Sequence, residues 1–267
     1  MSKIVLITGA SSGIGRATAE YLTQVGYRVY GTSRRSFEES VCFQTLIMDV
    51  TDGESVQKAI NELLLKEQRI DILINNAGLG NIGALEEIPE EMMRQVFDTN
   101  VWGLLRVCRA VLPIMRQQQS GLIINVSSIA GMIGLPFRGI YCASKASVEI
   151  LTETMRLEVR PFGVRVCSVL PGDVRTNINA NRLVALGAAS SPYRATVEAM
   201  NTQVNAEVSH ADDPIYIARA IRRAIERRPV QIHYVAGPFS QKMAVWLKRI
   251  LPNRWFEKLL RRSYGLR

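Results

Sequence analysis

The sequence predicts a doubly wound α/β domain, in which about seven parallel strands form one sheet with helices on both faces. Three observations support this. Short β-branched runs alternate with longer helical patterns along most of the chain. The strand-like runs are almost continuously apolar, which is typical of strands buried on both faces. The 267 residues are 47% hydrophobic and 21% charged, an ordinary globular composition.

Each predicted strand is a short apolar run, and a predicted helix follows most of them. The strands are expected at 4–8, 28–32, 45–48, 70–74, 122–126, 164–169 and 230–235. The helices are expected at about 13–25, 52–66, 90–117, 141–162 and 212–227, with a break near Asn100. Helices of this length between strands indicate right-handed crossovers and a parallel sheet.

The chain shows no linker, low-complexity run or internal repeat, so we expect one domain at 1–238 and a C-terminal extension at 239–267. No apolar run reaches the roughly 18 residues of a membrane span, and the N-terminus lacks a signal-peptide pattern. These features predict a cytoplasmic protein.

The cysteines and histidines do not predict a metal site. The four cysteines have no CxxC spacing and are expected to be reduced: Cys42, Cys108, Cys142 and Cys167. Only two histidines, His210 and His233, are present, and no cluster of metal-ligating residues accompanies them.

A glycine-rich turn, TGASSGIG at 8–15, follows the first strand directly and precedes the first helix. In such sheets ligands bind beyond the carboxyl ends of the strands. Glycines at this spacing let a backbone approach a pyrophosphate closely, with the helix N-terminus facing it. The expected cofactor contacts are Gly9, Ser11, Ser12, Gly13, Ile14 and Gly15.

The end of the second strand predicts NADP(H) rather than NAD(H). NAD-binding sites usually carry an acid here for the ribose 2′-hydroxyl, about 20 residues after the glycines. This chain has Thr32-Ser33-Arg34-Arg35 and no acid before Glu38. A guanidinium can hold a 2′-phosphate, so we expect Ser33, Arg34 and Ser12 at this end of the cofactor. The alternative is a solvated arginine pair.

Two further strand ends carry small or polar residues that suit a cofactor passing close to the backbone. Asp49 and Val50 follow the third strand, and Asn76, Ala77 and Gly78 follow the fourth. Either group, taken by itself, is equally compatible with a plain turn.

The stretch YCASK at 141–145 sets Tyr141 four residues before Lys145, which places both on one helical face. A cation close to a phenol lowers its pKa towards working pH, where an acid/base catalyst is most effective. Ser128 lies thirteen residues before Tyr141, after the fifth strand. The alternative is a surface tyrosine beside a solvated lysine.

Together these motifs resemble the short-chain dehydrogenase/reductase family. The residues that carry the resemblance are TGASSGIG (8–15), NNAG (75–78), Asn100, NVSS (125–128), YCASK (141–145) and PG (171–172). The resemblance implies a Rossmann fold. The stretch GLPFRGIYCASK is also similar to the subgroup that contains 17β-hydroxysteroid dehydrogenase type 1 and retinol-type reductases.

The resemblance also implies roles for particular residues. Tyr141 matches the general acid/base, Ser128 the hydroxyl that orients the carbonyl, and Lys145 the partner of Tyr141 and of the nicotinamide ribose. Asn100 matches the residue that positions a water on a proton relay. Pro171, Gly172, Val174 and Thr176 match the loop at the nicotinamide. Related enzymes are often dimers or tetramers, so we expect a homo-dimer or homo-tetramer formed through 90–117 and 141–162.

The predicted activity is the NADP(H)-dependent interconversion of a lipophilic ketone or aldehyde and its alcohol, with a steroid, retinoid or acyl ketone as substrate. Residues 175–208 are expected to form a substrate lid. Its apolar lining is expected from Leu135, Phe137, Ile178 and Met200, or these are plain core. The alternatives are a 3-oxoacyl thioester reductase and a catalytically silent NADP(H)-sensing regulator.

The C-terminal extension is a basic amphipathic segment with a break at Pro252. It carries eight Lys and Arg residues against Glu257 alone, so most of the net charge of +9 lies here. A basic tail is a local feature and does not predict a nucleic-acid-binding domain. Its apolar stripe is expected either to pack on the core or another subunit, or to make peripheral membrane contact.

Overall fold

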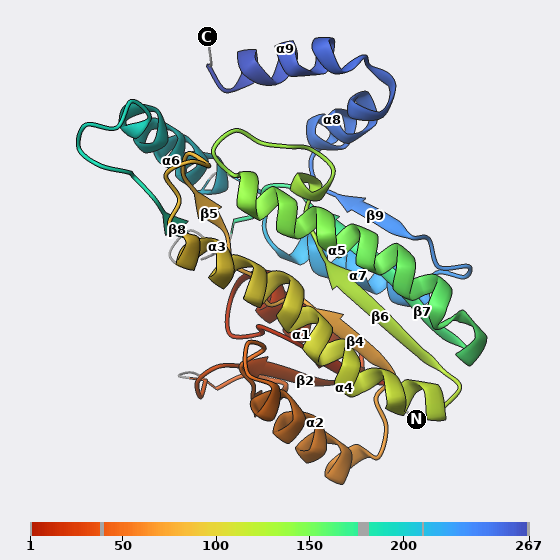
Figure 1. Ribbon diagram of the computed structural model, residues 1–267. Coiled ribbons are helices and arrows are strands. Elements are labelled where there is room, and N and C mark those ends of the chain that lie inside the picture. Colours follow the sequence, from red (N-terminus) through yellow and green to blue (C-terminus); the bar gives the residue numbers. More distant parts are fainter. Residues whose placement is uncertain (1, 38–39, 176–181, 210, 266–267) are drawn as a thin grey trace.

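Seven parallel strands form one sheet, in the order β3-β2-β1-β4-β6-β7-β9 (Figure 1). The computed structural model describes residues 2–37, 40–175, 182–209 and 211–265. The strands of the sheet are β1 (Ile4–Ile7), β2 (Arg28–Ser33), β3 (Gln44–Ile47), β4 (Ile72–Asn75), β6 (Gly121–Val126), β7 (Val164–Pro171) and β9 (His233–Ala236). The predicted doubly wound sheet is confirmed. Because β1 lies between β2 and β4, the strand order reverses there, which is where such sheets bind ligands.

Helices cover both faces of the sheet. The helices on one face are α1 (Gly13–Gln24) and α7 (Ile215–Glu226), and those on the other are α2 (Gly53–Glu67), α4 (Leu104–Gln117) and α5 (Gly139–Glu158). Figure 1 shows α4 and α5 running side by side across the sheet.

Each face of the sheet has its own apolar core, because successive strand residues point to opposite sides. In β1, Val5 and Ile7 pack with α1 and α7, whereas Ile4 and Leu6 pack with the helices of the other face. The continuous apolar runs of the sequence therefore serve two cores at once. This rigid centre fixes the loops at the carboxyl ends of the strands.

The long helix expected at 90–117 is broken at the predicted position. It consists of α3 (Glu90–Phe97), the π-helical turn η1 (Asp98–Gly103) and α4. Such π-helical turns are rare and often lie at functional sites. Here the turn carries Asn100, whose side chain is buried.

The sequence reading missed three elements. The two-residue strands β5 (Asn81–Ile82) and β8 (Leu183–Val184) pair in parallel, and helix α6 (Arg194–Ser209) lies mostly in the segment expected to form the substrate lid, where no helix was predicted. Four buried side chains anchor α6 against Ile82: Val197, Met200, Val204 and Val208. In Figure 1 these elements lie at the end of the molecule where the strands of the sheet terminate.

Two helices form the C-terminal extension, α8 (Phe239–Ile250) and α9 (Asn253–Ser263), with Pro252 between them as predicted. Their inner side is anchored by Val245 and Phe256, which pack with Ile133. The structure therefore supports packing on the core for one side of the stripe. No helix in the described part of the chain is long and apolar enough to cross a bilayer.

Candidate functional site

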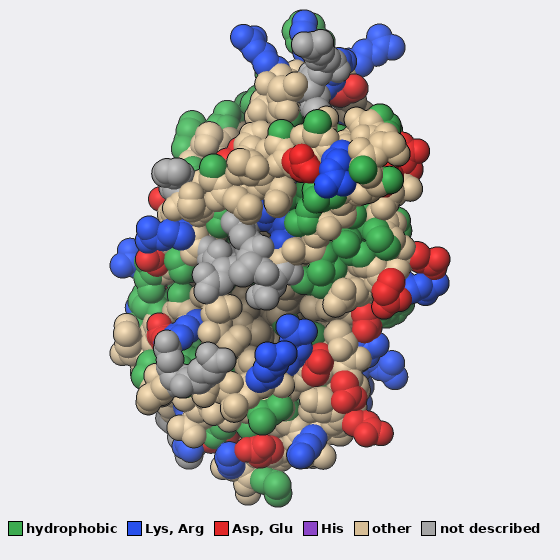
Figure 2. All heavy atoms as spheres, turned by 90° about the vertical axis from the view of Figure 1, so that its left-hand side faces the viewer, with side chains coloured by type: hydrophobic (Ala, Val, Ile, Leu, Met, Phe, Trp, Pro, Cys, Tyr) green, Lys and Arg blue, Asp and Glu red, His purple; other side chains and the backbone are tan. Residues whose placement is uncertain are grey.

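A cleft of about 1890 Å³ opens at the carboxyl ends of the strands. Its walls come from the loop after β1, the ends of the central strands, α5, α6 and the C-terminal helices. Figure 2 shows this side of the molecule, with a hollow near its centre bordered by Lys and Arg side chains. Segments far apart in the sequence thus meet in one site.

The glycine loop lies at one end of the cleft, and its backbone leaves no room for side chains. A Cβ atom on Gly15 would lie 2.2 Å from the carbonyl oxygen of Gly9, and one on Gly9 would lie 2.9 Å from the Cα of Ala77. Gly9 and Gly13 also have positive φ angles, of 67° and 56°. The loop therefore presents bare backbone to the cleft at the N-terminus of α1, which fits a nucleotide pyrophosphate.

Asn76 holds this loop in place. Its Nδ2 donates to the carbonyl oxygens of Thr8 at 2.9 Å and Gly9 at 3.0 Å, and the Oγ1 of Thr8 accepts from the backbone N–H groups of Asn76 and Ala77. The carboxyl ends of β1 and β4 are thereby joined. Asn76 lines the cleft as predicted, but its amide is used to support the glycine turn.

The end of β2 supplies basic residues to the same cleft. Ser12, Ser33, Arg34 and Arg35 line it, and both guanidinium-bearing side chains are exposed. Asp49 and Val50 lie next to them, and Oδ1 of Asp49 accepts from the backbone N–H and the hydroxyl of Thr51. The Asp49 carboxylate is thus occupied in ordering its own loop.

The four residues predicted to carry the chemistry come together at the middle of the cleft, and all are buried. Their exposed fractions are 2% for Asn100, 9% for Ser128, 7% for Tyr141 and 5% for Lys145. Ser128, Tyr141 and Lys145 line the cleft directly. A surface tyrosine beside a solvated lysine is therefore excluded.

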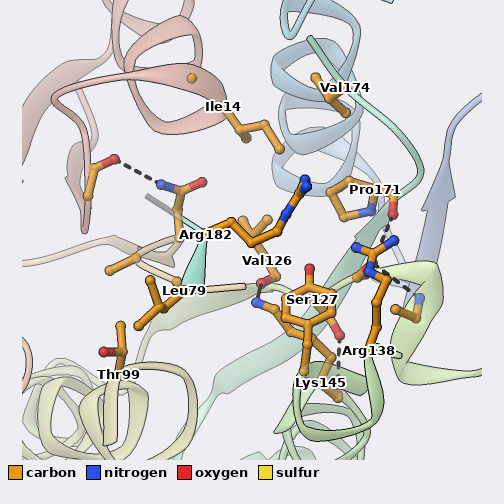
Figure 3. A pocket seen from close by; sticks show the side chains of 18 of the residues that line it. Ile14, Leu79, Thr99, Val126, Ser127, Arg138, Lys145, Pro171, Val174 and Arg182 are labelled. Atoms are coloured by element: carbon orange, nitrogen blue, oxygen red, sulfur yellow. Dashed lines mark hydrogen bonds between the residues drawn. The ribbon is translucent and has the colours of Figure 1, made fainter. Parts of the chain in front are cut away.

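Hydrogen bonds with nearby backbone fix these side chains. Nζ of Lys145 donates to the carbonyl oxygen of Val126 at 3.0 Å, as the dashed line in Figure 3 marks. Oγ of Ser128 accepts from the backbone N–H of Ala130 at 3.1 Å. The backbone N–H of Tyr141 donates to Oδ1 of Asn81 at 2.9 Å, so β5 helps to anchor the first turn of α5.

Burial has the largest effect on the protonation of this cluster. It raises the pKa of Tyr141 above its ordinary value, while the charge of Arg138 and the hydroxyl of Ser128 act to lower that pKa. Burial lowers the pKa of Lys145 to about 8, although the charge of Glu149 acts to raise it. In the chain alone, desolvation of the phenolate outweighs the nearby cation; the expected lowering by Lys145 together with a bound oxidised nicotinamide stays a prediction.

Glu149 lies one turn beyond Lys145 on α5 and is itself buried. Its Oε2 accepts from the hydroxyl of Ser168 at 2.9 Å and lies 2.8 Å from Nδ1 of His233. Hydrogen bonding to Glu149 is the largest effect on His233 and raises its pKa. A buried carboxylate is therefore held beneath the lysine by groups from β7 and β9.

Asn100 connects the π-helical turn to α5. Its Nδ2 donates to the carbonyl oxygen of Leu79 and to Oγ of Ser144, both at 2.9 Å, and its Oδ1 accepts from the N–H of Leu79 at 2.7 Å. A Cβ on Gly78 would lie 3.4 Å from Oδ1 of Asn100 and 3.5 Å from Nζ of Lys145. The predicted residues Gly78, Asn100 and Lys145 thus share one small volume.

The loop after β7 closes the other side of the cleft, where Pro171, Gly172 and Val174 form part of the lining. Ile14 and Val174 both border the pocket in Figure 3. Thr176 and Ile178 lie outside the described residues. Of the other residues expected to line the lid, Leu135 lines the cleft, whereas Phe137 and Met200 pack with α6 in a separate apolar cluster.

The sequence reading missed several charged groups in the cleft. Arg138, Asp173, Arg182 and Glu207 all line it, although the sequence predicted an apolar lining for the substrate side. Arg138 could have been found, because it lies only three residues before Tyr141, at the residue that precedes α5. The position of Arg182 depends on pairing between β5 and β8, which has no local signal.

The chain is similar throughout to known oxidoreductases. A sequence model of the family described as short chain dehydrogenase matches residues 3–185. A 3-ketodihydrosphingosine reductase of Bacteroides thetaiotaomicron is 38% identical over 266 residues, with 99% of both chains covered. Human 17-beta-hydroxysteroid dehydrogenase type 1 is 39% identical over 189 residues, which are 65% of this chain and 57% of the human one.

Solved structures agree with the fold. A short-chain dehydrogenase from Streptomyces avermitilis is 32% identical, with a TM-score of 0.83 over 99% of this chain and 98% of that one. A Burkholderia phymatum short-chain dehydrogenase/reductase in complex with NAD is 29% identical, with a TM-score of 0.80 over 92% of each chain. A Burkholderia cenocepacia short chain dehydrogenase in complex with NADP is 26% identical, with a TM-score of 0.74 over 98% and 97%.

Proposed function

Because the chain belongs to the short-chain dehydrogenase family, we propose that it interconverts a lipophilic ketone or aldehyde and its alcohol with NADP(H). The chain is an oxidoreductase, and the two Burkholderia relatives hold a nicotinamide nucleotide, one NAD and the other NADP. The observation that carries the proposal is the burial of Ser128, Tyr141 and Lys145 together, in the cleft that begins at the glycine loop.

The proposed chemistry is proton transfer to a carbonyl oxygen during reduction. When bound, a nicotinamide nucleotide supplies the hydride. The phenol of Tyr141 donates the proton, and the hydroxyls of Tyr141 and Ser128 together stabilise the negative charge that develops on the oxygen. Because burial raises the pKa of Tyr141, the phenol stays protonated at neutral pH, which favours its role as an acid in the reducing direction.

Lys145 and Asn100 are proposed to support the proton transfer without contacting the carbonyl oxygen themselves. The ammonium of Lys145 is proposed to bind the nicotinamide ribose and to return a proton to Tyr141. Asn100 is proposed to position a water on the relay. The side chain of Asn100 ties the loop at Leu79 to Ser144 on α5, so it also holds the relay in shape.

We propose NADP(H) rather than NAD(H) because of the residues after β2. Arg34 and Ser12 line the same part of the cleft, and the sequence places no acid between Ser33 and Glu38. A 2′-phosphate would be held there by charge-assisted hydrogen bonds, whereas a 2′-hydroxyl would gain little from a guanidinium. The ratio of KM values for NADPH and NADH tests this directly.

A long-chain ketone is the favoured substrate class. It is supported by the 3-ketodihydrosphingosine reductase, which matches over 99% of both chains, whereas the steroid dehydrogenase matches 65% of this one. The runner-up is a 3-oxoacyl thioester. The experiment is to compare kcat/KM for matched long-chain ketones, steroid and retinoid carbonyls and 3-oxoacyl thioesters. If only the thioesters are turned over, the substrate is a 3-oxoacyl thioester and not a long-chain ketone.

A catalytically silent NADP(H)-sensing regulator is the proposal from another class. A sensor needs the glycine loop but has no use for a buried lysine, tyrosine and serine in one cleft. The geometry therefore favours the enzyme. Tight NADPH binding with no turnover on any carbonyl of the panel would favour the sensor instead.

The C-terminal helices are proposed to make peripheral membrane contact, in keeping with a cytoplasmic enzyme that acts on a lipid. The side of α8 and α9 that does not pack on the core exposes large apolar side chains: Phe239, Trp246, Ile250, Trp255 and Leu259. Basic residues surround them, and a basic helix with exposed aromatics is attracted to anionic lipid. Leu260 and Tyr264 of the same segment line the cleft.

We also propose a domain organisation and an oligomeric state for this enzyme. Residues 1–238 form the catalytic domain, with a lid at 175–208, and 239–267 form an extension over the cleft. A homo-dimer or homo-tetramer is supported by the exposed apolar side chains of Trp102, Ile150 and Leu157 on η1 and α5.

A further inference from the structure

Two arginines from different parts of the chain face the cleft beside Tyr141. Arg138 directly precedes α5, and Arg182 directly precedes β8. Figure 3 shows both arginines at the pocket, with Arg182 extending across it above Ser127. The guanidinium carbon of Arg138 lies 5.3 Å from the centroid of the Tyr141 ring. Both charges are therefore placed where a substrate carbonyl would react.

The two guanidinium groups are close enough to repel each other. Burial, and after it the charge of Arg138, lower the pKa of Arg182 to about 10, while Tyr141 and Asp173 act to raise it. Nη1 of Arg182 donates to Oδ1 of Asn205 at 3.1 Å, which is a neutral acceptor. Holding two like charges together in a half-buried cleft costs free energy, and an anion between them would offset this cost.

The acids near the pair are satisfied by neutral donors. The carboxylate of Asp173 accepts a hydrogen bond from Nε2 of Gln241, and that of Glu207 accepts from Nε2 of Gln203 at 2.8 Å. No ion pair to Arg138 occurs within the ranges that the structure covers. Lys145 has the buried carboxylate of Glu149 beside it, whereas the two arginines share the cleft with Asp173 and Glu207.

We propose that Arg138 and Arg182 form an anion subsite beside Tyr141, which binds a carboxylate or phosphate carried by the substrate a few bonds from the reacting carbonyl. This rests on the proposed reductase function and deepens it. The substrate is then an amphipathic keto acid or keto phosphate, with its charged end at the arginines and its apolar part along the C-terminal helices. An ammonium in the same place is repelled, so this subsite would set the chain apart from the 3-ketodihydrosphingosine reductase, since a ketosphingoid base carries an amine beside its carbonyl.

The test uses three long-chain ketones that differ only in the group near the carbonyl: a γ-keto acid, its methyl ester and a matching trimethylammonium ketone. The loss of NADPH absorbance gives kcat/KM for each. The wild-type enzyme is expected to prefer the acid over the ester by about ten-fold or more, and the ester over the cation, since a charge-assisted hydrogen bond contributes about 1.5–3 kcal/mol.

Arg182→Gln is expected to lower the ratio of kcat/KM for acid to ester by about 10- to 100-fold, chiefly through KM, and Arg182→Lys to restore part of it. Arg194→Gln is the matched control, because Arg194 is a partly exposed arginine at the start of α6 that pairs with Glu198 and does not line the cleft. An equal loss on acid and ester in Arg182→Gln would overturn the subsite.

A second measurement separates the subsite from the cofactor and from the proposed function. Calorimetric titration of the enzyme–NADPH complex with hexadecanoate and with hexadecyl phosphate is expected to show binding that weakens about ten-fold or more in Arg182→Gln. The stronger ligand identifies the anion as carboxylate or phosphate. If only the methyl ester is reduced and neither anion binds, the proposed reductase activity is retained and the anion subsite is rejected. A large rise in the Kd of NADPH in Arg182→Gln would also overturn it, because the arginine would then serve the cofactor.

Discussion

The ammonium of Lys145 lies 6.0 Å from the centroid of the Tyr141 ring, one turn further along α5, and donates to the carbonyl oxygen of Val126 at the end of β6. One helix and one strand thereby fix an acid and a cation in the same buried place. The helix supplies the spacing, and the strand holds the ammonium in position. This relationship is the basis of the predictions that follow.

Tyr141→Phe should lower kcat by about 10²- to 10⁴-fold, because it removes the proposed proton donor and leaves the buried ring in place. The Kd of NADPH, measured by fluorescence titration, should change little. Tyr234→Phe on β9 is the control, since that tyrosine does not line the cleft. Near-full turnover in Tyr141→Phe would contradict the assignment of the acid.

The rate of reduction should fall at alkaline pH as Lys145 loses its proton. Burial lowers its pKa to about 8, and the charged form is the one proposed to act, so kcat should be full at lower pH and decline as pH rises through about 8. Tyr141, with a raised pKa, would deprotonate only at higher pH. A profile that stays flat to pH well above this value would rule out a role for the ammonium.

Glu149→Gln should move this alkaline decline in kcat to lower pH. The charge of Glu149 raises the pKa of Lys145, so its removal lowers that pKa further. Glu153→Gln is the control, because Glu153 also contacts His233, at 3.1 Å from its Nε2, but lies half exposed on the next turn. Equal shifts in both variants would mean that His233, rather than Glu149, determines the pH at which kcat declines.

Gly15→Ala should weaken NADPH binding by ten-fold or more, because the added Cβ would lie 2.2 Å from the carbonyl oxygen of Gly9 and push the loop apart. Gly53→Ala is the control: Gly53 begins α2, and no atom lies within 4 Å of where its Cβ would be. The Kd of NADPH for each variant, measured by calorimetry, tests this prediction. Unchanged affinity in Gly15→Ala would show that the loop does not hold the cofactor.

Arg34→Gln should raise KM for NADPH by about 10- to 100-fold and change KM for NADH by much less, because a charge-assisted bond to the 2′-phosphate is lost. Arg35→Gln provides the comparison with the neighbouring exposed arginine. Should both variants leave the ratio of the two KM values unchanged, the arginines would be solvated side chains with no part in cofactor choice.

The sequence predicted the parts of the site whose geometry is local. The glycine turn, the spacing of Tyr141 and Lys145 and the break at Asn100 each depend on a few consecutive residues. The seven strands of the sheet could also be predicted from local sequence, because each is a short apolar run. The subgroup resemblance also holds, since the human steroid dehydrogenase is among the relatives.

Features set by distant contacts were missed. The strands β5 and β8 are two residues long and pair across about a hundred residues, and Arg182 is placed by that pairing. The pKa of Tyr141 depends on how much of the fold buries it, which spacing does not reveal. Helix α6 did have a signal, because Val197, Met200, Val204 and Val208 recur at helical spacing.

Anionic vesicles should bind the wild-type protein through α9, and a Trp255→Ala, Leu259→Ala double variant should bind about ten-fold more weakly, since both side chains are exposed among basic residues. Leu65→Ala on α2 is the control, with a leucine that is 86% exposed far from the extension. Flotation with anionic and zwitterionic vesicles gives the readout. Failure of the wild-type protein to float with anionic vesicles would remove the membrane contact.

The most direct test of the central claim is to measure NADPH consumption and alcohol formation together, by absorbance and mass spectrometry, for the best long-chain ketone. We predict equal amounts of oxidised cofactor and alcohol in the wild-type enzyme, and loss of both in Tyr141→Phe. NADPH that binds in the cleft without any carbonyl being reduced would contradict the account.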